Sequence, residues 1–241
     1  MGSQSKGWNN VYKTAPSVYR LFANAQDHRP LLEEIRKGVG FESKKFLDVG
    51  TGTGKYAFLL IAEGVDEVVG IDKCGELLKI AMKEASEKRI KNLKFIELDA
   101  KKLPFVDLFD AAISAWAINA PWDDNYARLD EEIESILRAM RKGAPFFLST
   151  TPPGEYGGEL SNMIDPHIIE LHRNKKSNFI RYLKTKWGAQ ERLIPADWVF
   201  SSVEEAALCF GVFYGVQFAE AILEQRKVLI KANAVLLTMS K

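Results

Sequence analysis

The stretch FLDVGTGTGKY, residues 46–56, decides the fold of this chain. An apolar run leads directly into three glycines within five positions, Gly50, Gly52 and Gly54. Glycine tolerates positive φ angles and lets a ligand approach the backbone where a Cβ atom would collide. A helix is expected to begin near Lys55, and the first N–H groups of a helix have no partner within it. We therefore expect a ligand to lie against this loop.

Strand and helix patterns alternate on the C-terminal side of this stretch. The expected strands cover residues 44–49, 67–71, 93–98, 108–115 and 144–150, and the expected helices cover residues 55–63, 75–88 and 123–142. Gly143 marks the end of the third helix. Such alternation predicts βαβ units, right-handed crossovers and a parallel sheet.

The segments outside this alternation have weaker patterns. Residues 12–37 predict one or two short helices interrupted by Pro30, and residues 151–195 show no clear period. We expect a helix over residues 202–209, capped by Ser201 or Ser202. Residues 210–214 are apolar, and a helix at 217–226 and a strand at 234–239 complete the expected elements.

Composition limits the class of protein. The 241 residues fit one large α/β domain, and 46% apolar residues suffice for a sizeable core. The net charge of +1 gives no overall electrostatic signal for nucleic acid. Cys74 and Cys209 lie far apart and outside any CxxC or Cys/His pattern, so we expect neither a disulfide framework nor a metal site. No signal peptide or apolar stretch of about 20 residues is recognisable, which predicts a cytoplasmic protein without a membrane span.

Three acidic residues follow three successive expected strands. Asp48, Asp72 and Asp99 would meet at the carboxyl edge, where open α/β sheets bind their ligands. Asp48 suits a cationic ligand better than a pyrophosphate, Asp72 is placed to accept ribose hydroxyls, and Asp99 can reach an adenine amino group. The spacing GTGTG also differs from GxGxxG, which disfavours a nicotinamide-dependent oxidoreductase.

The ordered motifs resemble those of class I S-adenosylmethionine-dependent methyltransferases. They are FLDVGTGTGKY, VVGIDKCGELLKIA, FIELDAKKLPF, FDAAISAWAINAP and MRKGAPFFLSTTPP, within residues 44–153. The resemblance implies a three-layer Rossmann-like sandwich with a seven-stranded, mostly parallel sheet of order 3-2-1-4-5-7-6, its last strand antiparallel. It also implies that residues 210–214 form the sixth strand and residues 234–239 the last one. It implies S-adenosylmethionine as cofactor and S-adenosylhomocysteine as product.

This resemblance also organises the chain into one methyltransferase domain, residues 1–241. We predict an N-terminal helical cap (1–42), a cofactor-binding core (43–153), a lid inserted after strand five (154–198) and a C-terminal part of the core (199–241). The implied roles place the methionine part on the glycine loop, ribose on Asp72 and adenine near Asp99, with Asp48 orienting the loop and the cofactor amino group. The cofactor-binding residues implied are Asp48, Gly50, Thr51, Gly52, Gly54, Asp72, Lys73, Asp99, Ala100 and Trp116.

The acceptor side is less well specified by the residues. Candidate substrate residues are Tyr12, Tyr19, Asn119, Trp122, Tyr156 and His167. The tyrosines and tryptophans among them also fit a packing role, and His167, His172 and His28 fit solvated, capping or loop positions. Residues 114–121 read SAWAINAP and lack an NPPY-like tetrapeptide, which disfavours methylation of DNA adenine or protein glutamine. No general base, and so no catalytic residue, is identified.

Three functions remain compatible with these observations. The first is methyl transfer to a small-molecule acceptor by in-line displacement. The second is methylation of tRNA or rRNA, with the basic segment 160–195 as the RNA contact. The third is a non-catalytic cofactor-binding or partner subunit. The oligomeric state is not predicted.

Overall fold

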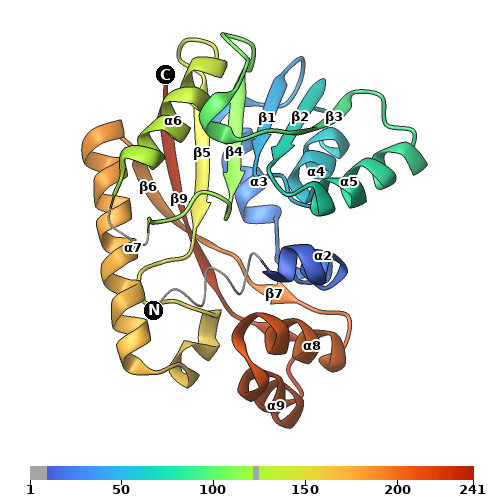
Figure 1. Cartoon of the computed structure of the whole chain (residues 1–241), viewed down its shortest axis with the longest axis vertical. Coiled ribbons are helices and arrows are strands. Elements are labelled where there is room, and N and C mark those ends of the chain that lie inside the picture. Colours follow the sequence, from blue (N-terminus) through green and yellow to red (C-terminus); the bar gives the residue numbers. More distant parts are fainter. Residues whose placement is uncertain (1–9, 122–124) are drawn as a thin grey trace.

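A seven-stranded sheet forms the centre of the computed structural model, which describes residues 10–121 and 125–241 (Figure 1). Its strand order is β3-β2-β1-β4-β5-β9-β6. The strands are β1 (Lys45–Val49), β2 (Glu67–Asp72), β3 (Leu93–Glu97), β4 (Ala111–Ala115), β5 (Pro145–Thr150), β6 (Gln190–Pro195) and β9 (Asn233–Ser240). The strands β1 to β5 pair in parallel, whereas β9 pairs antiparallel with both β5 and β6. The predicted order 3-2-1-4-5-7-6 is confirmed, with β9 as the seventh strand of the sheet.

Helices cover both faces of this sheet. They are α3 (Arg29–Val39), α4 (Lys55–Ala62), α5 (Gly75–Glu87), α6 (Ala127–Ala139) and α7 (Pro166–Trp187). Successive residues of a strand point to opposite faces. Accordingly, Leu47 packs in the core under α6 and α7, whereas its neighbour Phe46 packs in the core under α3 and α4. The result is the predicted three-layer sandwich.

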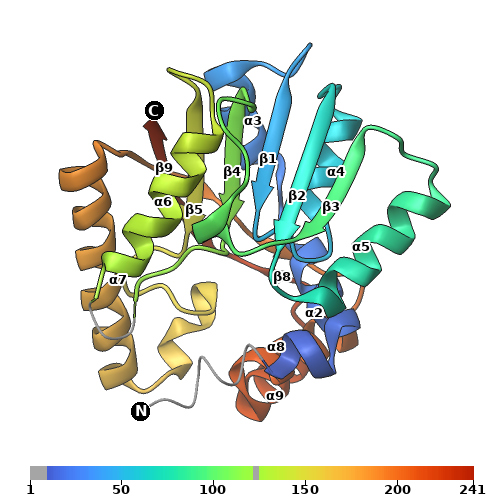
Figure 2. The ribbon, with the colours of Figure 1, turned by 45° about the horizontal axis from the view of Figure 1, so that its top comes forward.

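A third apolar cluster lies at the end of the sheet toward which β1 and β4 point (Figures 1 and 2). It joins α2 (Pro16–Ala25), α8 (Val203–Tyr214), α9 (Val216–Gln225) and the small sheet of β7 (Trp198–Val199) and β8 (Leu229–Ile230). The ring of Phe22 lies 4.7 Å from that of Phe213 and 5.2 Å from that of Trp198. Segments from opposite ends of the chain therefore meet beyond the carboxyl edge of the sheet.

The predicted strand at residues 210–214 is wrong. These residues form the last part of α8, which Ser202 caps by accepting a hydrogen bond from the Glu205 N–H. A short apolar run does not distinguish a strand from a buried helix, and Phe210 is fully buried among other aromatic rings. The sixth strand is β6 instead, in which only Ile194 is buried, so its sequence shows little hydrophobic pattern.

The range predicted as a lid thus holds regular elements of the fold. It contains the short 3₁₀ helix η2 (Gly158–Met163), the long helix α7 and strand β6. Pro30 lies in the first turn of α3, where a proline is tolerated, and does not interrupt the helix. The domain boundaries themselves stay a prediction. No helix in the described ranges has both the length and the apolar character of a membrane span.

Candidate active site

The glycine loop joins β1 to α4 in a conformation that only glycine adopts easily. The φ angles of Gly50, Gly52 and Gly54 are +70°, +57° and +87°. The N–H groups of Gly50 and Thr51 both donate to the Ile71 carbonyl, at 2.8 and 2.9 Å. A Cβ atom on Gly50 would lie 2.1 Å from the Cβ of Ala117. The loop is therefore held against both β2 and the segment that follows β4.

Asp48 is buried beneath this loop. The Thr51 hydroxyl donates to its Oδ2 at 2.6 Å, and the side chain is only 2% exposed. Burial raises the pKa of Asp48 to about 7, and the nearby charge of Asp72 adds to the increase. A cation placed beside this carboxyl group would favour its ionised form.

Asp72 ties the loop to the end of β2. Its Oδ2 accepts from the Gly52 N–H and its Oδ1 accepts from the Cys74 N–H, both at 2.9 Å. Burial raises the pKa of Asp72 above its ordinary value. Each carboxylate oxygen has a second lone pair, so both can still accept from a diol. Lys73, the next residue, is exposed.

Asp99 and Ala100 lie at the start of the 3₁₀ helix η1 (Ala100–Lys102), after β3. The Asp99 carboxylate accepts from the Lys101 N–H at 3.0 Å, and Asp99 itself is exposed. Ala100 packs against the core under α6 and α7. Their predicted contact with adenine stays a prediction.

Trp116 and Asn119 follow β4 beside the glycine loop. Trp116 has a φ of +56°, and its N–H donates to the Ser149 carbonyl at 3.0 Å. Its ring stacks on that of Tyr56 with the ring centres 6.3 Å apart. The Asn119 amide donates to the Trp116 carbonyl at 3.1 Å. Trp122, the other residue predicted here, lies outside the described residues.

Tyrosines from the N-terminal segment lie over the glycine loop. A Cβ atom on Gly52 would be 2.9 Å from the Tyr19 hydroxyl oxygen, and the Tyr12 and Tyr19 rings are 5.0 Å apart. Burial raises the pKa of Tyr12, and the charge of Asp72 raises it further, which places Tyr12 near that carboxylate. The Tyr156 ring lies 5.2 Å from that of Tyr214 in α8. We call these four tyrosines the roof.

Lys55 connects the roof to the loop. It is the first residue of α4, and its Nζ donates to the carbonyl oxygens of Ala23 at 2.7 Å and Gln26 at 2.5 Å. These carbonyls belong to the C-terminal end of α2, where a cation interacts favourably with the helix dipole. Burial lowers the pKa of Lys55 to about 7. The helix that carries Tyr19 is thus attached to the helix that begins at the glycine loop.

A buried polar cluster on α7 faces the ends of β4 and β5. The Lys176 Nζ donates to Thr150 Oγ1 at 2.5 Å and to Asn119 Oδ1 at 2.8 Å. One turn earlier, His172 Nε2 lies 3.3 Å from Thr151 Oγ1. Burial lowers the pKa of Lys176 to about 7 and that of His172 to about 4, the latter with a contribution from the Lys176 charge.

The predicted histidine of this segment does not join that cluster. His167 is exposed in the first turn of α7, where its N–H donates to the capping Asp165 at 2.8 Å. Lys176 was not predicted, although its spacing of four from His172 and its position on a helical face with Phe179, Ile180 and Leu183 could have indicated it.

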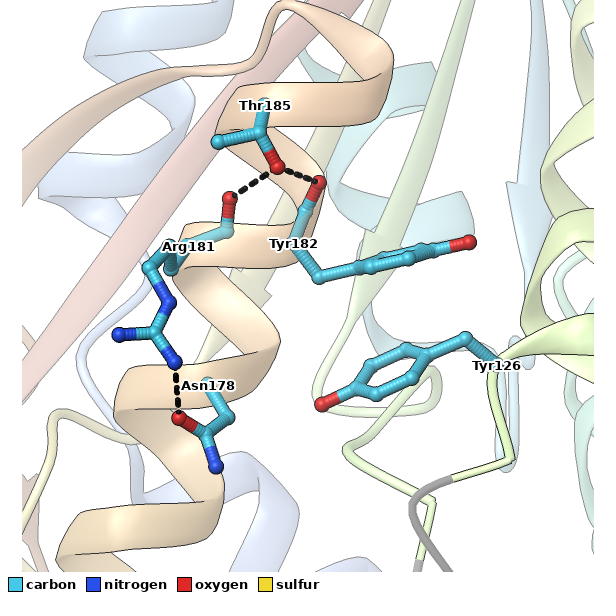
Figure 3. A pocket seen from close by; sticks show the side chains of 5 residues that line it. All are labelled: Tyr126, Asn178, Arg181, Tyr182 and Thr185. Atoms are coloured by element: carbon cyan, nitrogen blue, oxygen red, sulfur yellow. Dashed lines mark hydrogen bonds between the residues drawn. The ribbon is translucent and has the colours of Figure 1, made fainter.

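A surface hollow lies elsewhere on α7 (Figure 3). It is lined by Tyr126, Asn178, Arg181, Tyr182 and Thr185. The Tyr126 and Tyr182 rings stack at 4.1 Å, and Arg181 donates to Asn178 at 2.6 Å. None of the predicted cofactor residues lines this hollow, since they gather at the carboxyl edge of the sheet.

The fold is Rossmann-like, and comparison with known proteins shows the family. A family model described as "Methyltransferase domain" matches residues 41–187, more than half of the chain. The chain belongs to this family. The predicted class, S-adenosylmethionine-dependent methyltransferase, is confirmed.

Individual relatives agree with this assignment. The chain is 38% identical over 112 residues to the probable S-adenosylmethionine-dependent methyltransferase CRG1 of Saccharomyces cerevisiae, covering 45% of this chain and 37% of the relative. It is 38% identical over 158 residues to the demethylmenaquinone methyltransferase of Thermotoga maritima, covering 58% of this chain and 65% of the relative. The chain therefore spans less than two thirds of these curated relatives.

A solved structure supports the fold over most of the chain. The YcgJ protein of Bacillus subtilis superposes with a TM-score of 0.58 at 16% identity, covering 89% of this chain and 99% of that one. At this identity the likeness shows the fold alone.

Proposed function

We propose that this chain transfers a methyl group from S-adenosylmethionine to a small-molecule acceptor. The observation that carries the proposal is the glycine loop, which Asp72 holds at the Gly52 N–H while Tyr19 lies against the same residue from above. A loop enclosed by the roof suits a compact acceptor better than a polymer. The relative from Thermotoga maritima is likewise named for a small-molecule acceptor, demethylmenaquinone.

The residues at the carboxyl edge fit this cofactor. Asp72 has free lone pairs for the two ribose hydroxyls, and the buried carboxyl group of Asp48 suits a neighbouring ammonium group. The first N–H groups of α4 favour the carboxylate end of an amino acid. The cofactor, when bound, supplies an electrophilic methyl group on a sulfonium, which leaves as a neutral thioether.

The chain's own part in this transfer is to align the reactants and exclude water. An in-line displacement depends on orientation, which a fixed loop and packed side chains provide. The roof tyrosines, from α2, α8 and the segments beside them, shield the reacting centre from solvent. No catalytic base is required where the acceptor atom is already a nucleophile.

The alternative of an RNA acceptor loses its main support, the basic segment 160–195. Four of its cations form ion pairs with carboxylates. The pairs are Arg173–Glu170 at 2.5 Å, Lys184–Glu191 at 2.8 Å, Lys186–Asp130 at 2.6 Å and Arg192–Glu34 at 2.8 Å. A fifth cation, Lys176, is buried. This segment therefore offers phosphates much less free positive charge than its composition indicates.

Calorimetry with S-adenosylmethionine and S-adenosylhomocysteine tests the proposal first. We expect both to bind the purified chain, and absence of binding would refute the function. Transfer of a radiolabelled methyl group to a small-molecule extract, compared with total tRNA and rRNA, then separates the acceptor classes. Transfer to any acceptor by the single chain would exclude a non-catalytic partner subunit.

A further inference from the structure

The amine of Lys176 is buried in the fold and has no role in the proposed cofactor site. The residue is 7% exposed and lies on the face of α7 that also carries Phe179, Ile180 and Leu183. Its two hydrogen bonds go to neutral oxygens, those of Thr150 and Asn119. An ammonium group has three donors, so one N–H remains for another partner.

No carboxylate compensates this amine within the described part of the chain. The salt bridges found there do not involve Lys176, and burial alone accounts for its lowered pKa. Burying an ammonium without an opposite charge is strongly unfavourable. If Lys176 only connected α7 to the sheet, an uncharged hydrogen-bond donor could do so without the free-energy cost of burying a charge.

The His172 ring near Lys176 likewise has hydrogen-bonding capacity that no described residue uses. Among the described residues, nothing hydrogen-bonds to the buried Nδ1 of His172, whose Nε2 lies beside Thr151. The His172 ring is 5.2 Å from that of Tyr156 in the roof. Because the pKa of His172 is lowered to about 4, this ring is neutral near pH 7 and offers one donor and one acceptor.

The cluster lies next to the predicted methyl-donor site. Asn119 accepts a hydrogen bond from Lys176 and donates one to the Trp116 carbonyl. Ala117, the residue after Trp116, packs against Gly50 of the glycine loop. On the other side, Tyr156 links His172 to the tyrosines above Asp72. Asn119 is exposed, so the cluster reaches the protein surface at this residue.

We propose that Lys176, with His172, Asn119 and Thr150, binds an anionic oxygen of the methyl acceptor. This inference rests on the proposed function and adds the chemical class of the acceptor, namely a carboxylate or an acidic hydroxyl that binds in its ionised form. The anion supplies the opposite charge that no described residue provides at Lys176, and the remaining N–H of the ammonium donates to it. Lys176 then holds the acceptor on the side of the loop that faces Trp116.

The test uses the purified chain saturated with S-adenosylhomocysteine. The probes are small carboxylic acids and acidic phenols, each paired with its uncharged amide or methyl ether, and binding is read from thermal stabilisation and calorimetry. We expect acids to bind and their uncharged partners not to bind. Lys176→Met should weaken acid binding roughly ten- to hundredfold, the effect of removing a hydrogen bond from a charged group. Lys184→Met, an exposed position on the same helix, should bind acids as the unsubstituted chain does.

The outcomes separate this inference from the proposed function. The unsubstituted chain, Lys176→Met and Lys184→Met should bind S-adenosylhomocysteine with equal affinity. If the unsubstituted chain does not bind S-adenosylhomocysteine at all, the proposed function is refuted instead. If only carboxylic acids bind, the anionic oxygen of the acceptor is that of a carboxylate; if only phenols bind, it is that of an acidic hydroxyl. Absence of acid selectivity, or unchanged acid affinity in Lys176→Met, would overturn the inference. Lys176→Gln, which keeps a donor without the charge, should show the same loss and serves if the methionine variant does not fold.

Discussion

The hydroxyl group of Tyr19 lies against the backbone of Gly52, so that a Cβ atom on this glycine would be 2.9 Å from the phenol oxygen. The glycine belongs to the loop after β1, and the tyrosine belongs to α2, more than thirty positions earlier. Their contact shows that the N-terminal helix closes over the loop rather than packing only on the sheet.

Gly52→Val is expected to abolish cofactor binding while the chain still folds. The branched side chain would displace Tyr19 and force a φ of +57° that valine avoids. Calorimetry with S-adenosylhomocysteine measures the loss, and circular dichroism checks the fold. Gly143→Val is the matched control, because Gly143 has a φ of +77° but no atom within 4 Å of its Cβ position. If Gly52→Val binds S-adenosylhomocysteine as tightly as the unsubstituted chain, the loop is not part of the cofactor site.

Asp72→Ala is expected to weaken cofactor binding by about 1 to 3 kcal/mol, the range for hydrogen bonds to a charged group. The same change also frees the Gly52 and Cys74 N–H groups, so the loop itself loosens. Asp66→Ala is the control, because Asp66 is exposed and precedes the opposite end of β2. Equal affinity of the Asp72 and Asp66 variants would refute the ribose assignment.

Lys55→Met should detach α2 from the loop. The variant loses the hydrogen bonds to the Ala23 and Gln26 carbonyls, and we expect amide hydrogen exchange to accelerate in α2 more than in α3. Because Tyr19 then loses its position over Gly52, affinity for the cofactor should fall as well. Lys37→Met, an exposed position in α3, should leave both measurements unchanged. Exchange in α2 at the original rate would contradict this anchoring role.

The affinity for S-adenosylmethionine should increase as the pH rises through about 7. Burial holds the Asp48 pKa near 7, so its carboxylate is ionised above this pH and attracts a cation. The increase is at most about tenfold per pH unit, the limit for one linked proton. S-adenosylhomocysteine keeps the ammonium group proposed to lie beside Asp48, so its affinity should increase in the same way. Calorimetry from pH 6 to 8 measures the affinity for both ligands, and Asp48→Asn should make this affinity independent of pH. If the affinity of Asp48→Asn still rises with pH, Asp48 is not the source of the pH dependence.

Lys176→Met should change how stability depends on pH. The pKa of Lys176 falls from 10.5 to about 7 in the folded chain, so between these values the unfolded chain binds a proton that the folded chain does not. The free energy of unfolding therefore rises with pH in this window because of Lys176, and methionine removes that contribution.

The stability of Lys176→Met relative to the unsubstituted chain should accordingly be greatest near pH 6.5 and decrease toward pH 9.5. Urea unfolding at several pH values provides the measurement, and Lys184→Met should follow the unsubstituted chain. Parallel curves for Lys176→Met and the unsubstituted chain would show that the folded lysine keeps its ordinary pKa.

Local sequence patterns predicted the elements that local interactions specify. The alternation from β1 to β5, the glycine loop and the acids at 48, 72 and 99 follow from apolar periodicity and from residues that only suit turns and strand ends. The patterns failed at residues 210–214, where a short apolar run fits a helix as well as a strand.

The sequence by itself therefore determined the fold family and the edge of the sheet at which the cofactor is predicted to bind, because both depend on motifs whose residues are neighbours in the chain. Only the tertiary structure decided what covers that side. Tyr19 and Tyr214 meet their partners through contacts between distant segments, and Lys176 is buried against the end of β5 and the segment after β4 by the packing of α7. Such contacts depend on the assembled layers, which no local pattern specifies.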